Sequence, residues 1–257
     1  MVGAIDSYDQ LPMITIDGAY NFCDIGGVTT AADHLVRPRV VYRSASLDAL
    51  SPDGLATLAE LGIRTVIDIR SQGELDRNGR FAHEGTGVEW FHVVSSVGPP
   101  TDDDPAMVEV MASDDPMSLI FPLLVTRAAP MFAQALRLVA EAGRHPLVFH
   151  CTSGKDRTGL LALFIHLIVG VDLETALVDF ERSAEALAAV RGDMATRYPH
   201  MAAMPAATLD RMAAADRAWV MTALDTIGGL ANLEPWLDSI GVGPDIRSQL
   251  RSQLLIP

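Results

Sequence analysis

A cysteine and an arginine six positions apart carry the most specific chemical pattern in this sequence. They belong to the ten residues His150–Gly159, which read His-Cys-Thr-Ser-Gly-Lys-Asp-Arg-Thr-Gly. The apolar runs on either side predict a strand that ends at His150 and a helix that begins at Thr158. A short loop between a strand and a helix N-terminus presents backbone N–H groups to an anion. The spacing therefore predicts a loop that wraps once around a tetrahedral oxyanion, with the Cys151 sulfur beneath it and Arg157 donating two parallel hydrogen bonds.

The residue types in this loop suit nucleophilic catalysis on a phosphate group. A thiolate is a far better nucleophile than a thiol, and a helix N-terminus, a ring of amides and a nearby arginine lower the pKa of a cysteine. Cys151 is therefore the predicted nucleophile, and Gly154 is expected to adopt a positive φ that other residues resist. His150 is expected to fix the loop through its ring N–H groups, while Thr158 either donates to the sulfur or caps the helix. The predicted phosphate ligands are Thr152, Ser153, Gly154, Lys155, Asp156 and Arg157.

This decapeptide resembles the signature of the cysteine-dependent protein-tyrosine phosphatase superfamily, His-Cys-x5-Arg-Ser/Thr. Its inner Gly-Lys-Asp-Arg-Thr-Gly is similar to one branch, the bacterial tyrosine and lipid phosphatases of the mycobacterial phosphatase B type. The resemblance implies a metal-independent phosphomonoester hydrolase that acts on phosphotyrosine, and also on phosphoserine and phosphothreonine, in proteins through a cysteinyl-phosphate. Two alternatives stay open, a phosphoinositide phosphatase and a phosphate-binding pseudophosphatase.

The general acid has two sets of candidates. Asp156 lies inside the loop, and the resemblance to the Lys-Asp-Arg branch favours it; its alternative role is to tie the loop to the core. Asp102–Asp104 follow a predicted strand, where many tyrosine phosphatases place a mobile acid, but a solvated loop that caps a helix is the simpler interpretation. Lys155 resembles the cation with which phosphoinositide phosphatases meet a second phosphate. Alternatively, it gives general electrostatic support to the thiolate.

An upstream segment, Tyr20–Gly27, resembles the Asn-Phe-Arg-Asp-Leu-Gly-Gly element of the same family. Cys23 stands where the family has arginine. If that arginine helps to hold the site together, another residue must do so here. For Asn21 and Asp24 the sequence favours ordinary hydrogen bonding within a turn. A reversible disulfide between Cys23 and Cys151 is a further, less favoured possibility.

The run Arg64–Arg70 is nearly continuously apolar, which predicts a central parallel strand. With the serine and glutamate that follow, it resembles the family's Asp-Leu-Arg-Ser-x-x-Glu element. Ligands bind at the carboxyl ends of such strands. Arg70 is therefore expected to bind substrate, and Asp68 and Glu74 to orient it or Arg157, although a salt bridge at the strand end fits equally well.

Composition limits the partners of this chain. A net charge of −14 over 257 residues argues against nucleic acid or an anionic membrane as an electrostatic partner. A phosphate ester would then need a local positive pocket, for which Arg157, Lys155, Arg70 and Arg43 are the candidates. No cofactor is expected, and no His, Cys and carboxylate cluster has metal-ligand spacing. The absence of a signal-like N-terminus predicts a cytoplasmic protein, with leaderless export left open.

The predicted fold is α/β, with a central, mostly parallel sheet flanked by helices, a helical lid insertion and a helical C-terminal half. A single phosphatase domain is expected over residues 1–257, with the lid at 105–127. Trp219 and Met221 are expected to pack inward. The predicted strands are 13–16, 39–44, 64–70, 89–94 and 146–149, and the predicted helices are 51–61, 106–111, 130–142, 158–165, 172–190, 205–227, 233–237 and 246–255.

Overall fold

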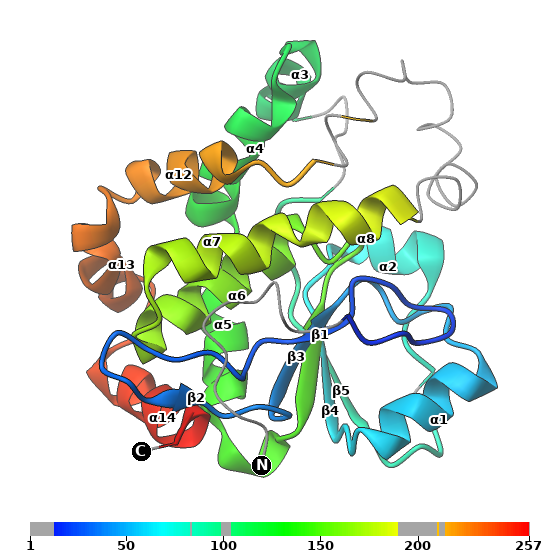
Figure 1. Cartoon of the computed structure of the whole chain (residues 1–257). Coiled ribbons are helices and arrows are strands. Elements are labelled where there is room, and N and C mark those ends of the chain that lie inside the picture. The colour runs from blue at the N-terminus through cyan, green and yellow to red at the C-terminus, as the bar shows by residue number, and fades with distance from the viewer. Residues whose placement is uncertain (1–12, 83, 99–103, 190–209, 211–213, 257) are drawn as a thin grey trace.

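The computed structural model describes residues 13–82, 84–98, 104–189, 210 and 214–256, which form an α/β fold around one central sheet (Figure 1). Four of its five strands run parallel to one another, whereas the first strand, at one edge of the sheet, runs antiparallel to its neighbour. The predicted, mostly parallel sheet is therefore confirmed. In spatial order its strands are β1 (Cys23–Asp24), β3 (Val41–Ser44), β6 (Leu147–His150), β4 (Thr65–Asp68) and β5 (Glu89–His92).

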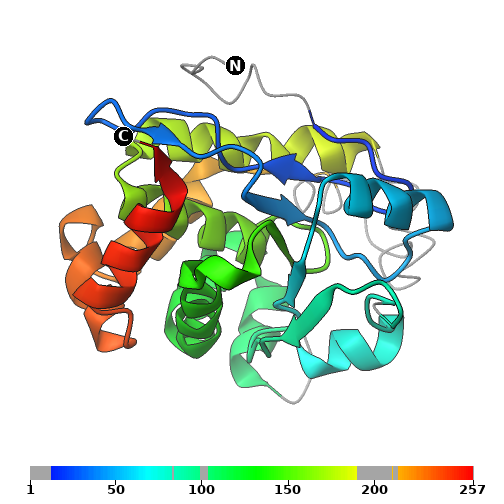
Figure 2. The same ribbon diagram turned by 90° about the horizontal axis from the view of Figure 1, so that it is seen from below.

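Helices cover both faces of the sheet, because successive side chains of each strand point to opposite faces and both sets are apolar. On one face, Ile67 and Phe149 pack with residues of α5 (Ala129–Ala140) and α6 (Asp156–Val169). On the other face, Val66 and Val148 pack with Leu58 of α1 (Pro52–Glu60). Figure 2 shows α1 and α5 on opposite sides of the strands.

Local sequence sets where the helices begin and end. Ser51 caps α1 by accepting a hydrogen bond from the Gly54 N–H. Ser71 caps α2 (Gln72–Asn78) and forms a capping box with Glu74, whose side chain accepts from the Ser71 N–H. The buried helix α6 ends at Gly170, whose φ of 95° is the left-handed conformation that stops a helix.

The C-terminal half is helical, as predicted. The segment predicted as a lid forms α3 and α4, which pack on each other, and α12 packs along α4 (Figure 1).

A two-stranded ribbon pairs Leu35–Val36 with Leu255–Ile256, the last residues described. The lid role and the single domain stay predictions. The remaining elements are α3 (Pro105–Ala112), α4 (Pro116–Arg127), η2 (Ala142–Arg144), α7 (Leu173–Glu181), α8 (Ser183–Ala189), α12 (Arg217–Thr226), η3 (Leu230–Asn232), α13 (Leu233–Ser239), α14 (Pro244–Leu254), β2 (Leu35–Val36) and β7 (Leu255–Ile256).

Some predicted elements are wrong. Residues 13–16 form no strand, because a turn through Gly18, with φ of 85°, brings Ile16 directly opposite Ala19. The helix predicted over 172–190 is divided into α7 and α8. Trp219 is buried, but Met221 is exposed, since residues two apart on a helix lie on opposite sides. Residues 190–209 and 211–213 lie outside the described residues, so the predicted start of the helix at 205 does too.

No single described helix is both long enough and apolar enough to cross a membrane. Only α4 and α5 taken together meet those two criteria, as a pair bent by 66°.

Gly159 provides a test of how closely α6 packs. An added Cβ at this position would lie 2.6 Å from Cδ2 of Phe180, which is buried and packs edge-on against Phe121. We therefore predict that Gly159→Ala lowers the free energy of unfolding by about 1–3 kcal/mol, measured by urea denaturation.

The matched control is Gly73→Ala in α2, where an added Cβ meets nothing within 4 Å. This change should leave stability unchanged or raise it by up to about 1 kcal/mol. Equal effects of the two substitutions would contradict the packing argument.

Candidate active site

Four polar residues lie side by side at the carboxyl ends of the parallel strands. Ser44, His150, Asp68 and His92 are paired in register on β3, β6, β4 and β5. The first three are completely buried. The loop that begins at Cys151 leaves this edge of the sheet and leads directly into α6. The sheet therefore fixes where the loop starts.

The first two carbonyl groups of the loop are hydrogen-bonded from outside it. Nδ1 of His150 lies 3.0 Å from the Cys151 carbonyl oxygen, which can only accept, so this nitrogen carries the proton. The Ser46 N–H donates to the Thr152 carbonyl oxygen at 3.0 Å. A ring N–H of His150 thus contacts the loop, and the role of His150 in fixing the loop stays a prediction.

The next three carbonyl groups are also bound from outside. The side-chain amide of Asn21 donates to the carbonyl oxygens of Ser153 at 3.3 Å and Gly154 at 2.9 Å. The Gly159 N–H donates to the Lys155 carbonyl oxygen at 2.6 Å. Because the N–H and C=O of one peptide group point in opposite directions, the N–H groups of this loop turn toward its inside. Asn21 thus has a part in the loop that turn chemistry alone did not reveal.

The inside of the loop offers donors without protein partners. The N–H groups of Thr152, Ser153 and Gly154 donate to no group in the described part of the chain. Gly154 has a φ of 68°, as predicted, and a Cβ there would lie 2.6 Å from the backbone at the end of β3. Cys151 is buried at the start of this loop. Successive inward N–H groups of this kind form an anion-binding concavity.

Helix α6 begins at Asp156, two residues before the predicted start at Thr158. Thr158 is therefore not a cap, because it is the third residue of the helix. Its hydroxyl is completely buried and has no hydrogen-bond partner among the described residues. A hydrogen bond from this hydroxyl to the sulfur stays a prediction.

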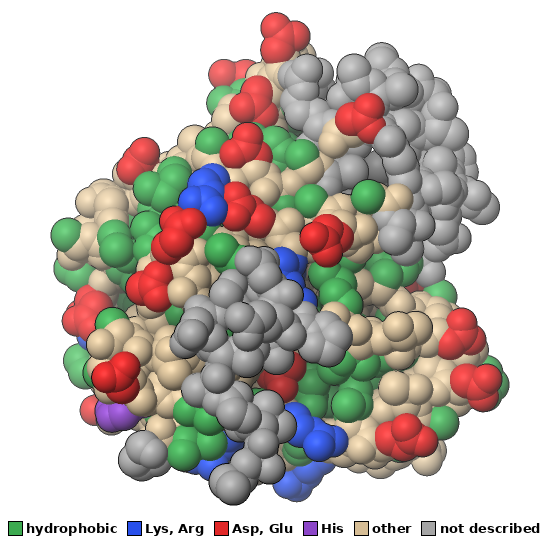
Figure 3. Space-filling view, in the orientation of Figure 1, with side chains coloured by type: hydrophobic (Ala, Val, Ile, Leu, Met, Phe, Trp, Pro, Cys, Tyr) green, Lys and Arg blue, Asp and Glu red, His purple; other side chains and the backbone are tan. Residues whose placement is uncertain are grey.

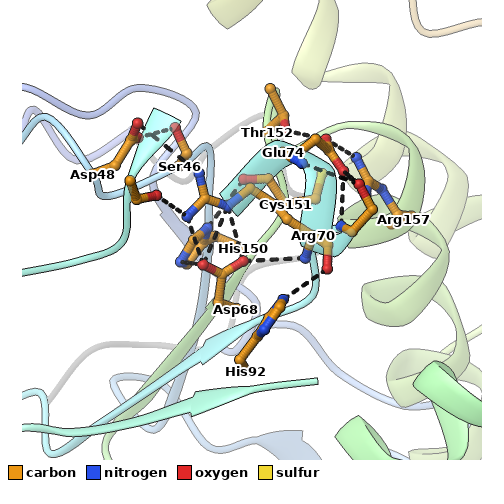
Figure 4. Close-up of polar contacts among 12 residues, drawn as sticks. Ser46, Asp48, Asp68, Arg70, Glu74, His92, His150, Cys151, Thr152 and Arg157 are labelled. Carbon is orange, nitrogen blue, oxygen red and sulfur yellow. Dashed lines mark hydrogen bonds and ion pairs between the residues drawn. The ribbon is translucent and has the colours of Figure 1, made fainter. Parts of the chain in front are cut away.

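Glu74 holds the Arg157 guanidinium from one edge (Figure 4). Nη1 and Nη2 donate to the two carboxylate oxygens, each at 2.6 Å, and Nη1 also donates to the Val97 carbonyl oxygen at 3.4 Å. Glu74 itself accepts from the Ser71 N–H at 2.8 Å and from the Thr152 hydroxyl. A guanidinium has five N–H donors, so the Nε–H and one Nη2–H are left for an oxyanion.

Both members of this ion pair stay charged. Burial opposes the charge on each, but the mutual attraction outweighs it. The Arg157 charge holds the pKa of Glu74 well below its usual range, and Glu74 holds the pKa of Arg157 above its usual value. Of the two carboxylates predicted to orient an arginine, Glu74 is the one that contacts Arg157.

Arg70 is paired with Asp68 inside the protein. It is completely buried, and its Nε and Nη2 donate to the Asp68 carboxylate at 2.9 Å and 2.6 Å. Burial would raise the pKa of Asp68, but its hydrogen bonds and charged neighbours, Arg70 among them, hold it below its usual value. The strand-end salt bridge, the equal alternative, is thus the geometry observed, and contact of Arg70 with substrate stays a prediction.

His150 completes this cluster. Burial lowers its pKa, which makes the ring neutral near pH 7. Its Nε2 lies 3.8 Å from the Asp68 carboxylate. With Nδ1 donating to the loop, His150 links the Asp68–Arg70 pair to the Cys151 carbonyl (Figure 4).

A second buried arginine supports the loop from behind. Nη1 of Arg43 donates to the Asp179 carboxylate at 2.8 Å, and its Nη2 donates to the Ser183 hydroxyl at 2.5 Å. Nη2 also lies 3.5 Å from Oδ1 of Asn21, which sets the amide so that its nitrogen faces the loop. The sequence gives no signal for this network, because Asp179 lies 136 positions from Arg43.

Cys23 is buried opposite Arg43 in the antiparallel pair of β1 and β3. Burial raises the pKa of its thiol. Its position on β1 is two strand spacings, roughly 9–10 Å, from β6, which leads to Cys151. That separation is too large for a disulfide without backbone movement, and both cysteines are free.

The described candidates for the general acid, Asp156 and Asp104, differ in the groups that they contact. Asp156 is partly exposed, and its Oδ1 lies 3.3 Å from the Lys155 ammonium. Asp104 caps α3 and forms an ion pair with Arg127 at 2.6 Å, which agrees with the predicted capping. Asp102 and Asp103 lie outside the described residues.

The expected pocket of four cations is not found. Arg43 and Arg70 are completely buried in ion pairs, and Lys155 is also buried. Arg157 forms an ion pair with Glu74, which balances its charge. Acidic side chains are spread over the face in Figure 3, with few basic ones. Among the described residues, no group of three or more His, Cys, Asp or Glu side chains could hold a metal ion.

The chain resembles known phosphatases over most of its length. Residues 14–256 match a model of the tyrosine phosphatase family. The triple specificity protein phosphatase PtpB of Mycobacterium tuberculosis is 27% identical over 199 residues, which cover 68% of this chain and 71% of that protein. A putative tyrosine-protein phosphatase of Cupriavidus necator is 32% identical over 66% of this chain, and the match spans 62% of that protein. A tyrosine-protein phosphatase of Nostoc commune is 27% identical over 98% of this chain and 84% of its own length.

Solved structures resemble the chain more distantly. The catalytic domain of the PP-IP phosphatase SIW14 from S. cerevisiae, in complex with citrate, shares 18% identity with a TM-score of 0.40, over 88% of this chain and 98% of that one. P. aeruginosa TpbA shares 22% identity with a TM-score of 0.34, over 64% of this chain and 87% of its own.

The Glu74–Arg157 pair can be tested by removing one charge. Glu74→Gln leaves a buried guanidinium without its counter-charge, so we predict a loss of about 3–5 kcal/mol in the free energy of unfolding at pH 7. Because folding depresses the Glu74 pKa, this contribution is complete above the unfolded value of about 4.3 and is lost as the pH falls below it. The stability difference between the two proteins should therefore shrink below about pH 4, measured by denaturation at several pH values.

Glu84→Gln is the control, since Glu84 forms an exposed ion pair with Arg80. Its effect should stay below about 0.5 kcal/mol at every pH. If Glu74→Gln also behaved in this way, the pair would not be the constraint that the geometry indicates.

Proposed function

The chain belongs to the tyrosine phosphatase family, and we propose that it hydrolyses phosphotyrosine in proteins through a phosphocysteine formed at Cys151. The observation that supports this proposal most directly is the loop after β6. Its carbonyls are bound from outside, its N–H groups face inward, and Arg157 has two donors left on the same site. Hydrolysis of phosphoserine and phosphothreonine is included in the proposal, since PtpB of M. tuberculosis is described as a triple specificity phosphatase.

In the first step, the Cys151 thiolate attacks phosphorus. A sulfur–phosphorus bond forms as the bond to the tyrosine oxygen breaks, and that oxygen keeps the electron pair. The inward N–H groups and Arg157 stabilise the three equatorial oxygens, where charge is concentrated in the transition state. The N-terminus of α6 adds its dipole to the same site.

We assign the general acid to Asp156, which would give its proton to the departing phenolate oxygen. Its carboxyl group is in the loop itself and is partly exposed, with Oδ1 lying 3.3 Å from the Lys155 ammonium. Asp104 is less suitable, because it already caps α3 and pairs with Arg127.

In the second step, water attacks phosphorus and the sulfur–phosphorus bond breaks, which regenerates the thiolate. Asp156, now ionised, accepts the proton of this water. Phosphate then leaves the loop. Glu74 serves as a positioning residue, because it touches Arg157 and Thr152 but offers no free oxygen to the reacting atoms.

A cytoplasmic location completes the proposal. It is supported by the two free thiols, one of which is the proposed nucleophile, because such thiols persist in a reducing compartment.

The activity is tested by Cys151→Ser. We predict that hydrolysis of p-nitrophenyl phosphate and of a phosphotyrosine peptide falls at least about a thousandfold, because serine lacks the thiolate. The variant should still bind phosphate, measured by calorimetry. Cys23→Ser is the matched control and should retain activity, since Cys23 lies two strands away. Residual turnover in Cys151→Ser equal to wild type would exclude the proposed intermediate.

The assignment of the acid is tested by Asp156→Asn with two substrates. We predict that kcat for phenyl phosphate, a poor leaving group, falls about 10²–10⁴-fold, because its phenolate needs a proton. For 2,4-dinitrophenyl phosphate, whose leaving group needs none, the loss should be less than about tenfold. Asp104→Asn is the control and should affect both substrates equally and weakly. Equal slowing of both substrates by Asp156→Asn would move the acid elsewhere.

A further inference from the structure

Lys155 is the only lysine in the 257-residue sequence. It lies in the middle of the loop, yet only 2% of its side chain is exposed. A loop cation with a free ammonium would attract a second negative group on a substrate. The surroundings of Lys155 therefore bear on which phosphate esters the site accepts.

The ammonium is already bound by residues of the same chain. Nζ donates to the Ala214 carbonyl oxygen at 2.9 Å and lies 3.3 Å from the Asp156 carboxylate. It also lies 5.1 Å from the centroid of the Trp219 ring, over its face. An ammonium has three donors, so a second phosphate on a substrate would have to replace existing contacts.

The Trp219 ring is itself fixed. Its Nε1 donates to the Asp115 carboxylate at 3.2 Å, at the start of α4, and the ring packs against Phe121 with centroids 6.2 Å apart. Only 4% of Trp219 is exposed. The contact between α12 and α4 thus holds the aromatic face where it covers Lys155.

We propose that Trp219 sequesters the Lys155 ammonium and thereby makes the site prefer phosphotyrosine over phosphate esters that carry a second phosphate group, such as phosphoinositides. This proposal rests on the function proposed above and names the substrate class of the same site. Trp219 is a specificity-determining residue that acts through Lys155 rather than by contact with the reacting atoms. Without the ring, the ammonium loses one of its intramolecular contacts and becomes available to the second phosphate group of a substrate.

The first experiment measures whether Lys155 is covered, independently of catalysis. Because the chain has a single lysine, acetylation by an N-hydroxysuccinimide ester at one side chain can be followed by peptide mass spectrometry. We expect Lys155 in the native protein to react much more slowly than in the urea-denatured protein. Trp219→Leu should raise the native rate about tenfold, whereas Trp219→Phe, which keeps an aromatic face, should change it little.

The second experiment measures preference. The kcat/KM values for water-soluble phosphatidylinositol 3-phosphate and for a phosphotyrosine peptide are compared in the same variants. We expect Trp219→Leu to raise the ratio of lipid to peptide activity about tenfold, and Trp219→Phe to leave it near wild type. Adding Lys155→Met to Trp219→Leu should remove the gain, because the gain depends on the released ammonium.

Leu224→Ala controls for loosening of the helices, since it removes a buried apolar side chain from α12, the helix that carries Trp219. A similar ratio change in Leu224→Ala would assign the effect to loosening and overturn the proposal. Fast acetylation of the native wild type, or an unchanged ratio in Trp219→Leu despite faster acetylation, would overturn it too. If neither the wild type nor any variant hydrolysed p-nitrophenyl phosphate, the proposed function would be wrong. The acetylation rates would still show whether Trp219 covers Lys155.

Discussion

The site depends on the direction in which five consecutive peptide groups face. Each carbonyl from Cys151 to Lys155 is held from outside the loop, by a histidine ring, two backbone N–H groups and one asparagine amide. A typical hydrogen bond of this kind contributes only about 1 kcal/mol net to stability. The larger effect of these hydrogen bonds is on orientation. Each one fixes a carbonyl group, so the N–H group of the same peptide is held facing the inside of the loop before an oxyanion binds. Preorganised dipoles of this kind need no rearrangement during a reaction.

The phosphate site that we propose must attract an anion in a chain with a net charge of −14. Its attraction is not a surplus of cations, because Arg43, Arg70 and Arg157 all face carboxylates. The attraction is local, since amide dipoles and two guanidinium donors act over a few ångströms. Carboxylates more distant than about 8–10 Å are screened at physiological ionic strength. The same pairing fixes the guanidinium of Arg157 in one orientation, which a flexible cation could not maintain.

The sequence predicted this site well where neighbouring residues determine the structure. The strand–loop–helix order, the positive φ of Gly154 and the cap at Ser51 all follow from local residue types. It predicted less well where distant side chains choose their partners. Nothing in the local pattern could tell that Glu74 pairs with Arg157 and Asp68 with Arg70, since one carboxylate ends β4 and the other lies six residues later. The burial of Lys155 beneath Trp219, 64 positions later, depends on how α12 packs on α4.

The strand order has a consequence for how the protein emerges from the ribosome. β3 and β4 are made early, yet they do not touch, because β6 lies between them. Neither can complete its hydrogen bonding until about 150 residues have been synthesised, and a nascent chain shorter than that exposes two apolar strand edges. β6 fills the space between these two strands, and its last residue, His150, directly precedes the loop. Closure of the sheet and assembly of the anion cradle are therefore expected to occur as one late event, so that truncated translation products carry no partly formed site.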